Sequence, residues 1–365
     1  MSKTLRVGVI GASARRGWAK ISHVPAIQQL DGLELAAVVT QDQPSANEAA
    51  QAFGAAKGYG DPKQLFADPD IDIVTVAVNV PAHRALVLGA LAAGKHVFCE
   101  YPLGRDLAET EMLARAAREA GAHTAIGLQL RASPAALRAR ALVASGAIGR
   151  VLNASILSTT MAFGPDAEAA MAFAEQAENG VSVATIQAGH TVDLAISVLG
   201  GLAELSALAA TQFPQVRVEG KDGPKPQTRT IPDYLSVLAR LESGAPVSIE
   251  TIGGRPANDT PFRFTITGEK GALLLQGGAE RGVQSGILRL SRDGQSLEVD
   301  PFAVPAPETA SHVAGLYALL RDDILAGTRS VPGFDHGMRM SRLIADALNA
   351  SAHGTRVAAS AWPRH

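Results

Sequence analysis

Two hydrophobic patterns divide the chain. In the first third, short β-branched apolar runs alternate with longer amphipathic segments, which predicts strands and helices in alternation. Strands are expected at residues 5–10, 33–40, 73–78, 96–99 and 124–127, with helices at 45–53, 81–93 and 106–120 and one beginning near Pro25. This alternation predicts an α/β fold whose N-terminal Rossmann domain, residues 1–128, is a doubly wound parallel sheet covered by helices.

The second pattern covers residues 129–365 and predicts an α/β substrate and dimerisation domain. Helices are expected at 134–145, 180–199, 313–325 and 338–351, and strands at 151–158, 235–241, 246–252, 263–267, 272–275 and 287–290. Gly, Pro and Asp turns between the later strands favour a large, open, mostly antiparallel sheet. Because such a sheet has a face that must be covered, we expect a homodimer or higher homo-oligomer through it. The Ala- and Glu-rich stretch 161–179 is expected to form a lid or pocket wall.

Composition narrows the class of protein. Of 365 residues, 47% are hydrophobic and 19% charged, as in soluble globular proteins. A net charge of −2 gives no basic surface for nucleic acid or anionic membranes. The most apolar run, 71–97, is interrupted by polar and charged residues, so no membrane span is expected. A single cysteine excludes a disulfide framework and cysteine-clustered metal sites, which favours a reducing, cytoplasmic location and no metal.

A glycine turn follows the first predicted strand. Strand, glycine turn and helix in this order are typical of dinucleotide binding, because the helix offers free N–H groups and a positive dipole end to the pyrophosphate. Gly11 holds the first position of the fingerprint, Ser13 replaces its second glycine, and Arg15-Arg16-Gly17 lengthens or shifts the third. The alternative is an ordinary turn between strand and helix.

Thr40 ends the second predicted strand, where NAD-selective sites usually carry a carboxylate for the adenosine ribose hydroxyls. Threonine would not repel a 2′-phosphate, and Arg15 and Arg16 in the adjacent turn can pair with one. The sequence therefore predicts NADP(H) as the preferred cofactor and NAD(H) as the alternative. In the other interpretation, both arginines are merely solvated.

Local signatures in a fixed order point to a family. They are VGVIG at 7–11, HVPAI at 23–27, LFADPDID at 65–72, PAH at 81–83, GKHV at 94–97, EYP at 100–102, RASP at 131–134, GAIG at 146–149, GHTVD at 189–193 and GEKG at 268–271. Together they resemble the Gfo/Idh/MocA oxidoreductase family. LQLRASP at 128–134, GHT at 189–191 and IPD at 231–233 are most similar to its Gal80-like branch.

The resemblance implies a Rossmann domain followed by an open-sheet domain that often pairs subunits. It also implies NAD or NADP binding and hydride transfer to or from a sugar or cyclitol carbon. Family members carry a Glu-Lys-Pro motif whose lysine lies near the nicotinamide, and a proton-transferring histidine with an aspartate one turn before it. In this chain Glu100 and Pro102 match, whereas Tyr101 replaces the lysine. His190 matches the histidine, and Ile186 stands where the aspartate is expected.

The candidate site residues follow from these matches. Tyr101 and His190 are the candidate catalytic residues, and Thr185, Gln187 and Asp193 join them as candidate substrate contacts. Candidate cofactor contacts are Gly8, Gly11, Ser13, Arg15, Arg16, Thr40, Asn79, His83, Glu100 and Arg131. His190 and Asp193 are three residues apart and share a helix face, so Asp193 can orient the imidazole. The alternative is a structural histidine with Asp193 capping or solvated.

Two functions remain open. One is an NAD(P)-dependent oxidoreductase acting on CH–OH groups of a carbohydrate-like ligand, with Tyr101 or His190 as the acid–base group. The other is a non-catalytic, NADP-binding regulatory or sensor protein of the Gal80 kind, in which Tyr101 only shapes the pocket wall. Loss of both the lysine and the aspartate is the pattern expected of an active site that no longer works.

Overall fold

The computed structural model describes residues 3–220, 223–256, 262–301 and 308–358, and the chain forms two compact units. Unit 1 comprises Met1–Gln129 with Pro301–Met338, and unit 2 comprises Leu130–Asp300 with Arg339–His365. Residues 301–338, which the sequence pattern groups with the second domain, thus cluster with the first. Within unit 1 the Ile126 N–H donates to the Pro332 carbonyl at 2.8 Å, which ties this later segment to the sheet.

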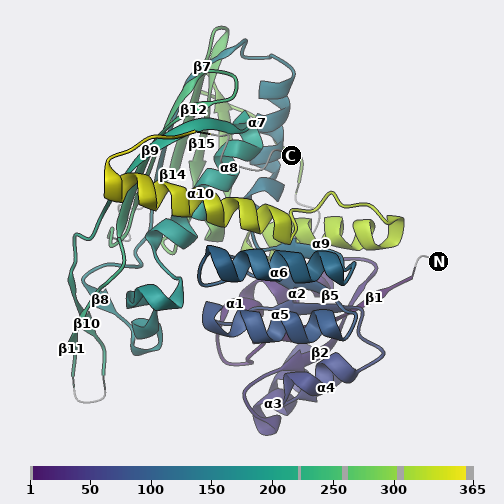
Figure 1. Ribbon diagram of the computed structural model, residues 1–365. Helices are drawn as coiled ribbons and strands as arrows, with labels where there is room; N and C mark the ends of the chain where they lie inside the picture. The colour runs from purple at the N-terminus through teal and green to yellow at the C-terminus, as the bar shows by residue number, and fades with distance from the viewer. Residues whose placement is uncertain (1–2, 221–222, 257–261, 302–307, 359–365) are drawn as a thin grey trace. The chain divides into compact units, whose positions relative to one another are not determined.

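Unit 1 is built on a parallel sheet, of which β1, β2 and β5 are labelled in Figure 1. The sheet has six strands, all parallel, in the order β3-β2-β1-β4-β5-β6. Its strands are β1 (Leu5–Ile10), β2 (Leu33–Val39), β3 (Lys57–Tyr59), β4 (Ile73–Val76), β5 (His96–Cys99) and β6 (Thr124–Ile126). Their apolar side chains are buried on both faces of the sheet, which explains the continuous hydrophobic runs. The strand order reverses between β1 and β4, and in such sheets ligands bind at the carboxyl ends of the strands beside that point.

The helices of unit 1 begin at recognisable caps. They are α1 (Trp18–Ile21), α2 (His23–Gln29), α3 (Gln43–Phe53), α4 (Pro62–Ala67), the 3₁₀ turn η1 (Val80–Ala82), α5 (His83–Ala92), α6 (Leu107–Glu119) and α9 (Glu308–Ala326). Asp42, Asp61 and Asp106 each accept a backbone N–H at the start of a helix. The helix expected to begin near Pro25 is α2, which begins at His23 and so has Pro25 in its first turn, where the missing N–H removes no helical bond.

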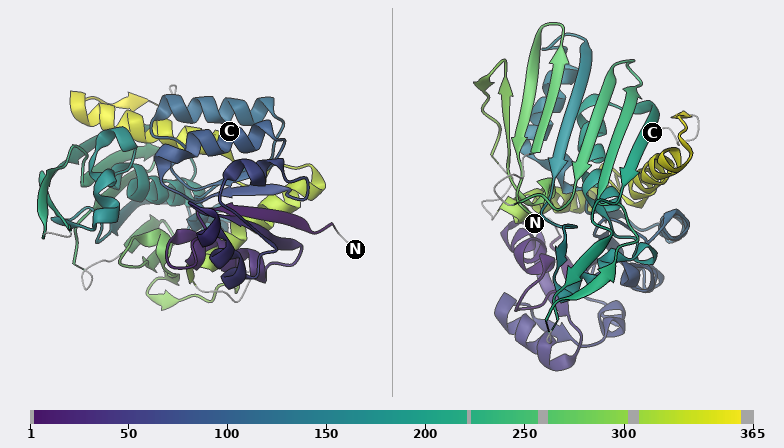
Figure 2. Two further views of the ribbon diagram at one scale, coloured as in Figure 1. Left: turned by 90° about the horizontal axis from the view of Figure 1, so that it is seen from below. Right: turned by 90° about the vertical axis from the view of Figure 1, so that its left-hand side faces the viewer.

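Figure 2 shows the large sheet of unit 2. The sheet has nine strands in the order β17-β16-β15-β14-β7-β13-β12-β9-β18. Only β7 and β13 pair in parallel, so the predicted mostly antiparallel sheet is confirmed. The strands are β7 (Val151–Thr159), β9 (Leu202–Ala210), β12 (Tyr234–Leu241), β13 (Pro246–Ile252), β14 (Phe262–Gly268), β15 (Gly271–Gly277), β16 (Leu288–Arg292), β17 (Gln295–Ser296) and β18 (Val357–Ala358). A smaller sheet joins β8 (Asp166–Ala167), β10 (Gln215–Val218) and β11 (Lys225–Thr228).

The helical elements of unit 2 correct one prediction. Those wholly within unit 2 are α7 (Pro134–Ala144), η3 (Ala169–Glu175), η4 (Ala177–Asn179), η5 (Val183–Gln187), α8 (Ala188–Leu199) and η7 (Val283–Ser285). Two others, η2 (Gln129–Ala132) and α10 (Phe334–His353), begin in unit 1 and end in unit 2. The single helix expected at 180–199 is instead a π-helical turn, η5, followed by α8. Ser182 caps the Thr185 N–H, which sets its start, and π-turns inside helices are frequent at functional sites.

No helix in the described part of the chain combines the length and hydropathy needed to cross a membrane.

Candidate functional site

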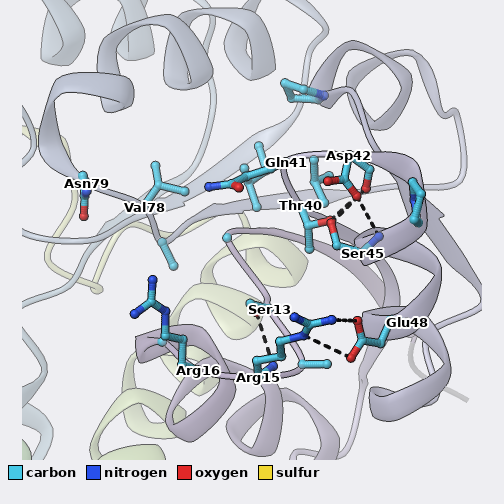
Figure 3. Close-up of a pocket in the computed structure, with 18 residues that line it drawn as sticks. Ser13, Arg15, Arg16, Thr40, Gln41, Asp42, Ser45, Glu48, Val78 and Asn79 are labelled. Atoms are coloured by element: carbon cyan, nitrogen blue, oxygen red, sulfur yellow. Dashed lines mark hydrogen bonds and ion pairs between the residues drawn. The ribbon is translucent and has the colours of Figure 1, made fainter. Parts of the chain in front are cut away.

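A pocket of about 1040 Å³ lies in unit 1 at the carboxyl ends of β1, β2 and β4, where the strand order reverses (Figure 3). Its size suits a ligand larger than an ordinary metabolite, since small-molecule sites occupy roughly 300–1,000 Å³. Gly11 forms the turn at its base with φ of 95°. A Cβ at Gly11 would lie 2.3 Å from the Ala77 carbonyl oxygen, so only glycine allows this close approach. This glycine-floored pocket fits the pyrophosphate of a dinucleotide.

The pocket gathers most of the predicted cofactor contacts. Those that line it are Gly11, Ser13, Arg15, Arg16, Thr40 and Asn79. Gly8 lies within β1, where a Cβ would lie 2.3 Å from Leu65 Cδ1 of α4, so this glycine allows the helix to pack on the strand. The sequence reasoning missed four further polar lining residues, Asp42, Ser45, Gln41 and Glu48. The capping motif Asp42-Gln43-Pro44-Ser45 directly after the second strand was the signal for the first two.

Charges of both signs line the pocket. Arg15 pairs with Glu48 at 3.3 Å, whereas Arg16 extends away from that pair and has no ion-pair partner among the residues the structure describes (Figure 3). Donation from the Ser45 N–H lowers the pKa of Asp42, so this carboxylate is ionised at neutral pH. Two arginines and two carboxylates therefore cancel in formal charge. Arg16 is the cation best placed to meet an added phosphate.

Thr40 lines the pocket, and its hydroxyl is part of a small hydrogen-bonded group. Its Oγ1 lies 2.7 Å from Ser45 Oγ and 3.1 Å from the Asp42 carbonyl oxygen. The two hydroxyls and the first turn of α3 thus form a polar wall at the end of β2. Such a wall can donate hydrogen bonds either to ribose hydroxyls or to a phosphate.

Glu100 follows β5 at the same edge of the sheet, and its N–H donates to the Val76 carbonyl at 3.1 Å. Its Oε1 lies 2.7 Å from His23 Nε2 in α2, and His23 Nδ1 lies 2.9 Å from the Tyr317 hydroxyl of α9. The carboxylate rests on Gly127, because a Cβ there would lie 2.7 Å from Glu100 Oε2. Glu100 is therefore confined between an imidazole and a glycine. Tyr101, the next residue, is buried and joined to Pro102 by a cis peptide bond.

His83 connects the loops that follow β4 and β5. Its Nε2 lies 2.9 Å from the Val78 carbonyl oxygen and its Nδ1 lies 3.0 Å from that of Pro102. Burial lowers the pKa of His83, although these carbonyls and Glu100 act in the opposite direction. A neutral imidazole donates only one hydrogen bond, so the ring satisfies one of the two carbonyls at a time. His83, predicted as a cofactor contact, thus holds the loops beside the pocket from within the core.

The candidate residues of unit 2 lie around η5 and α8. The buried Asp193 carboxylate forms a bidentate ion pair with Arg131. Arg131 Nε lies 3.1 Å from Asp193 Oδ2, and Arg131 Nη2 lies 2.9 Å from Asp193 Oδ1. His190 is 3% exposed one turn earlier on the same helix. Gln187 is buried and donates to Ser158 Oγ at 2.7 Å, whereas the Thr185 hydroxyl bonds to Ser182 in a capping box. The sequence placed Arg131 with the cofactor contacts and did not pair it with Asp193.

No cluster of three or more His, Cys, Asp or Glu side chains that could hold a metal ion occurs among the described residues.

Comparisons with known proteins agree with this architecture. A family model described as oxidoreductase family, NAD-binding Rossmann fold matches residues 5–128, and one described as Gal80p, C-terminal domain matches residues 134–277. The dehydrogenase aclE of Aspergillus oryzae is 32% identical over 286 residues, which cover 76% of this chain and 78% of that protein. The galactose/lactose metabolism regulatory protein GAL80 of Saccharomyces cerevisiae is 28% identical over 292 residues, covering 75% and 67%.

A solved structure of levoglucosan dehydrogenase in complex with NADH and L-sorbose has the same fold. It superposes with a TM-score of 0.82 at 21% identity and covers 97% of this chain and 98% of that chain.

The glycine-floored pocket in a 3-2-1-4-5-6 parallel sheet defines a dinucleotide-binding protein of the Rossmann class. More narrowly, the chain belongs to the Gfo/Idh/MocA oxidoreductase family with its NAD-binding domain, and its second half is Gal80-like. The resemblance inferred from the sequence signatures is confirmed.

Proposed function

We propose that this protein is an NAD(P)-dependent oxidoreductase that transfers hydride to or from an alcohol or carbonyl carbon of a carbohydrate-like molecule. The observation that supports this most is the dinucleotide-sized pocket at the strand-order reversal, with the confined carboxylate of Glu100 on the neighbouring strand end. Dehydrogenases are among the relatives, and one neighbouring structure holds NADH and a sugar.

The chain would hold the cofactor through the Gly11 turn at the pyrophosphate, the end of β2 at the adenosine ribose and Glu100 at the nicotinamide ribose. When bound, the nicotinamide exchanges a hydride with the substrate carbon. A proton must then move to or from the reacting oxygen, and we assign this step to the Tyr101 phenol or the His190 imidazole. The pairing of Arg131 with Asp193 would keep α8, and with it His190, in a fixed orientation.

The cofactor is proposed to be NADP(H) with NAD(H) as the alternative. Arg16 and the hydroxyls of Thr40 and Ser45 favour a 2′-phosphate, whereas Asp42 and Glu48 oppose it. The two dissociation constants, measured by fluorescence titration of the reduced cofactors, decide between them. Substituting Arg16→Gln should weaken NADPH binding about tenfold and leave NADH binding within about twofold, because a phosphate–guanidinium pair contributes roughly 1–2 kcal/mol.

The large sheet is proposed to pair two copies of the chain. Leu208 of β9 and Leu238 of β12 lie on neighbouring strands and are 61% and 58% exposed. Leucines this exposed on adjacent strands are typical of an interface rather than of a free surface. Light scattering on the wild type and on Leu238→Glu measures the oligomeric state, and a wild-type monomer would contradict the proposal.

The second candidate is a non-catalytic, cofactor-responsive regulator. Tyr101 in place of the family lysine favours it, as does the match of residues 134–277 to the Gal80p C-terminal domain. A phenol that only lines the pocket would bind ligand without moving a proton.

One experiment separates the two functions. The protein is incubated with NAD(P)H or NAD(P)⁺ and a panel of sugars, sugar acids and keto-sugars, and absorbance of the reduced nicotinamide is followed. Turnover that is lost in Tyr101→Phe or His190→Ala, but kept in the matched controls Tyr234→Phe and His353→Ala, supports the oxidoreductase. Cofactor binding without turnover on any substrate supports the regulator.

A further inference from the structure

A chain of four hydrogen-bonding side chains runs through the core of unit 1 and ends at Glu100. Thr75 Oγ1 of β4 lies 2.7 Å from the Tyr317 hydroxyl of α9, which lies 2.9 Å from His23 Nδ1 of α2. His23 Nε2 lies 2.7 Å from Glu100 Oε1. Thr75, Tyr317 and His23 are fully buried, whereas the Glu100 side chain is 15% exposed. The chain therefore connects the interior to the sheet edge, and only its last member reaches the surface.

The order of donors in this chain follows from the chemistry of its ends. Burial raises the pKa of Tyr317, so this phenol keeps its proton. If Thr75 donates to Tyr317 and Tyr317 donates to His23, Nδ1 is the acceptor and Nε2 carries the N–H of the ring. That N–H then points at Glu100, which accepts it as a carboxylate. In this arrangement each of the three donors has its acceptor, which buried polar groups require.

The imidazole has little freedom to turn away from Glu100. The Phe98 ring stands perpendicular to His23, with centroids 5.1 Å apart, and the Tyr317 ring does the same at 5.7 Å. On the other side, the Glu100 carboxylate packs against the backbone of Gly127. The contact is so close that a Cβ at Gly127 would lie within 3.0 Å of both carboxylate oxygens. His23 itself is too deeply buried to touch a ligand, so any influence on one must pass through Glu100.

We propose that His23, oriented by Tyr317, is a positioning residue that fixes the Glu100 carboxylate for the hydroxyls of the nicotinamide ribose. This inference rests on the proposed function, in which Glu100 contacts that ribose. It gives His23 no part in proton transfer to substrate. The hydrogen-bonded chain of Thr75, Tyr317 and His23 instead holds the Glu100 carboxylate in the orientation that two vicinal ribose hydroxyls require. It does so before the cofactor binds.

The test compares a ligand that reaches Glu100 with one that does not. NADH or NADPH, whichever the wild type binds more tightly, contains the nicotinamide ribose, and ADP contains only the adenosine and pyrophosphate part. Dissociation constants for both ligands are measured in the full chain. His23→Phe keeps a ring of similar volume but removes the hydrogen bond to Glu100. It should weaken binding of the reduced dinucleotide about tenfold, the usual effect of losing a hydrogen bond to a charged group, and leave ADP within about twofold.

Three further variants separate positioning from general structural support. His23→Gln returns an N–H donor toward Glu100 and should recover binding to within about threefold of the wild type. Tyr317→Phe preserves packing and should weaken dinucleotide binding less than His23→Phe does. In the Glu100→Gln background, His23→Phe should cause no additional loss, because its effect passes through that carboxylate. The matched control is His96→Gln, a histidine at the opposite end of β5 that accepts the His123 N–H.

The outcomes are distinct. Equal weakening of dinucleotide and ADP in His23→Phe, additive losses in the double variant, or no rescue by His23→Gln would each overturn the positioning role. If the conservative Tyr317→Phe protein matches the wild type while His23→Phe fails to fold, the proposed orientation by Tyr317 is wrong. If the wild type itself binds neither NADH nor NADPH, the proposed function has failed, and that result is visible before any variant is made.

Discussion

Each end of the proposed cofactor site in unit 1 has a carboxylate paired with a basic side chain, and the two pairs differ mainly in how deeply they are buried. At the adenosine end, Arg15 and Glu48 meet at 3.3 Å with side chains 81% and 47% exposed. At the nicotinamide end, His23 and Glu100 meet at 2.7 Å with side chains 0% and 15% exposed. An exposed pair contributes about 0–1 kcal/mol and rearranges readily, whereas a buried pair fixes geometry. One end is therefore adaptable, and the other is preorganised.

The largest effect is expected in unit 2, which contains the same contrast between a buried and an exposed ion pair. Arg229 is fully buried and bonds Glu175 at 2.5 Å and Asp233 at 3.0 Å. Arg229→Ala should lower the free energy of unfolding by about 3–5 kcal/mol, because it leaves buried carboxylates without their cation. Arg217→Ala, which removes an exposed pair with Asp166, should leave the free energy of unfolding nearly unchanged, because solvent screens this pair.

Urea unfolding followed by circular dichroism measures both variants. The double variant Arg229→Met with Glu175→Leu should be more stable than Arg229→Ala, since it leaves one buried carboxylate, Asp233, without a cation instead of two. Equal losses in Arg229→Ala and Arg217→Ala would contradict the view that burial separates the two kinds of pair.

Buried and exposed histidines should also differ in how they change the stability of the protein at acidic pH. Burial lowers the pKa of His312 on α9 to about 4, so the folded protein keeps this ring neutral where the unfolded chain protonates it near pH 6.5. The unfolded state then binds more protons, and stability falls as pH drops from about 6.5 to 4, by up to about 3 kcal/mol for this group at pH 4. His312→Gln should flatten the pH dependence of the urea midpoint, and the exposed control His353→Gln should not. An unchanged slope in His312→Gln would count against the neutral buried ring.

The sequence was sufficient for most of the fold because strand and helix periodicity is local. β1, β2 and β5 lie where their apolar runs predicted, and Asp106 caps α6 as helix-start chemistry requires. The three-residue strand β3 and the six-residue helix α4 were missed, because so few residues give no period. Hydrophobic spacing does not distinguish a π-turn from an α-helix, so the sequence predicts one continuous helix where the structure has η5 followed by α8.

The candidate site also contains residues that could be predicted from local sequence and contacts that could not. Gly11, Arg15 and Arg16 could be assigned from the sequence because one turn contains them all. The contact between His23 and Tyr317 joins residues 294 positions apart, and that between Arg131 and Asp193 spans 62. No periodicity links such positions, so only the folded chain reveals them. Buried networks are therefore what sequence reasoning misses first, although they set the geometry of the functional groups.

The smallest expected effect concerns the exposed pair itself. Glu48→Gln frees Arg15 and removes one of the two carboxylates that line the pocket, so NADPH should bind about three- to fivefold more tightly while NADH changes less than twofold. Because both side chains are solvent-exposed, the gain should shrink as salt rises from 0.05 to about 0.5 M. Glu119→Gln, on α6 away from the lining residues, serves as the control. A gain that is equal for both cofactors, or that persists at high salt, would mean that Glu48 acts by shaping the pocket rather than by neutralising Arg15.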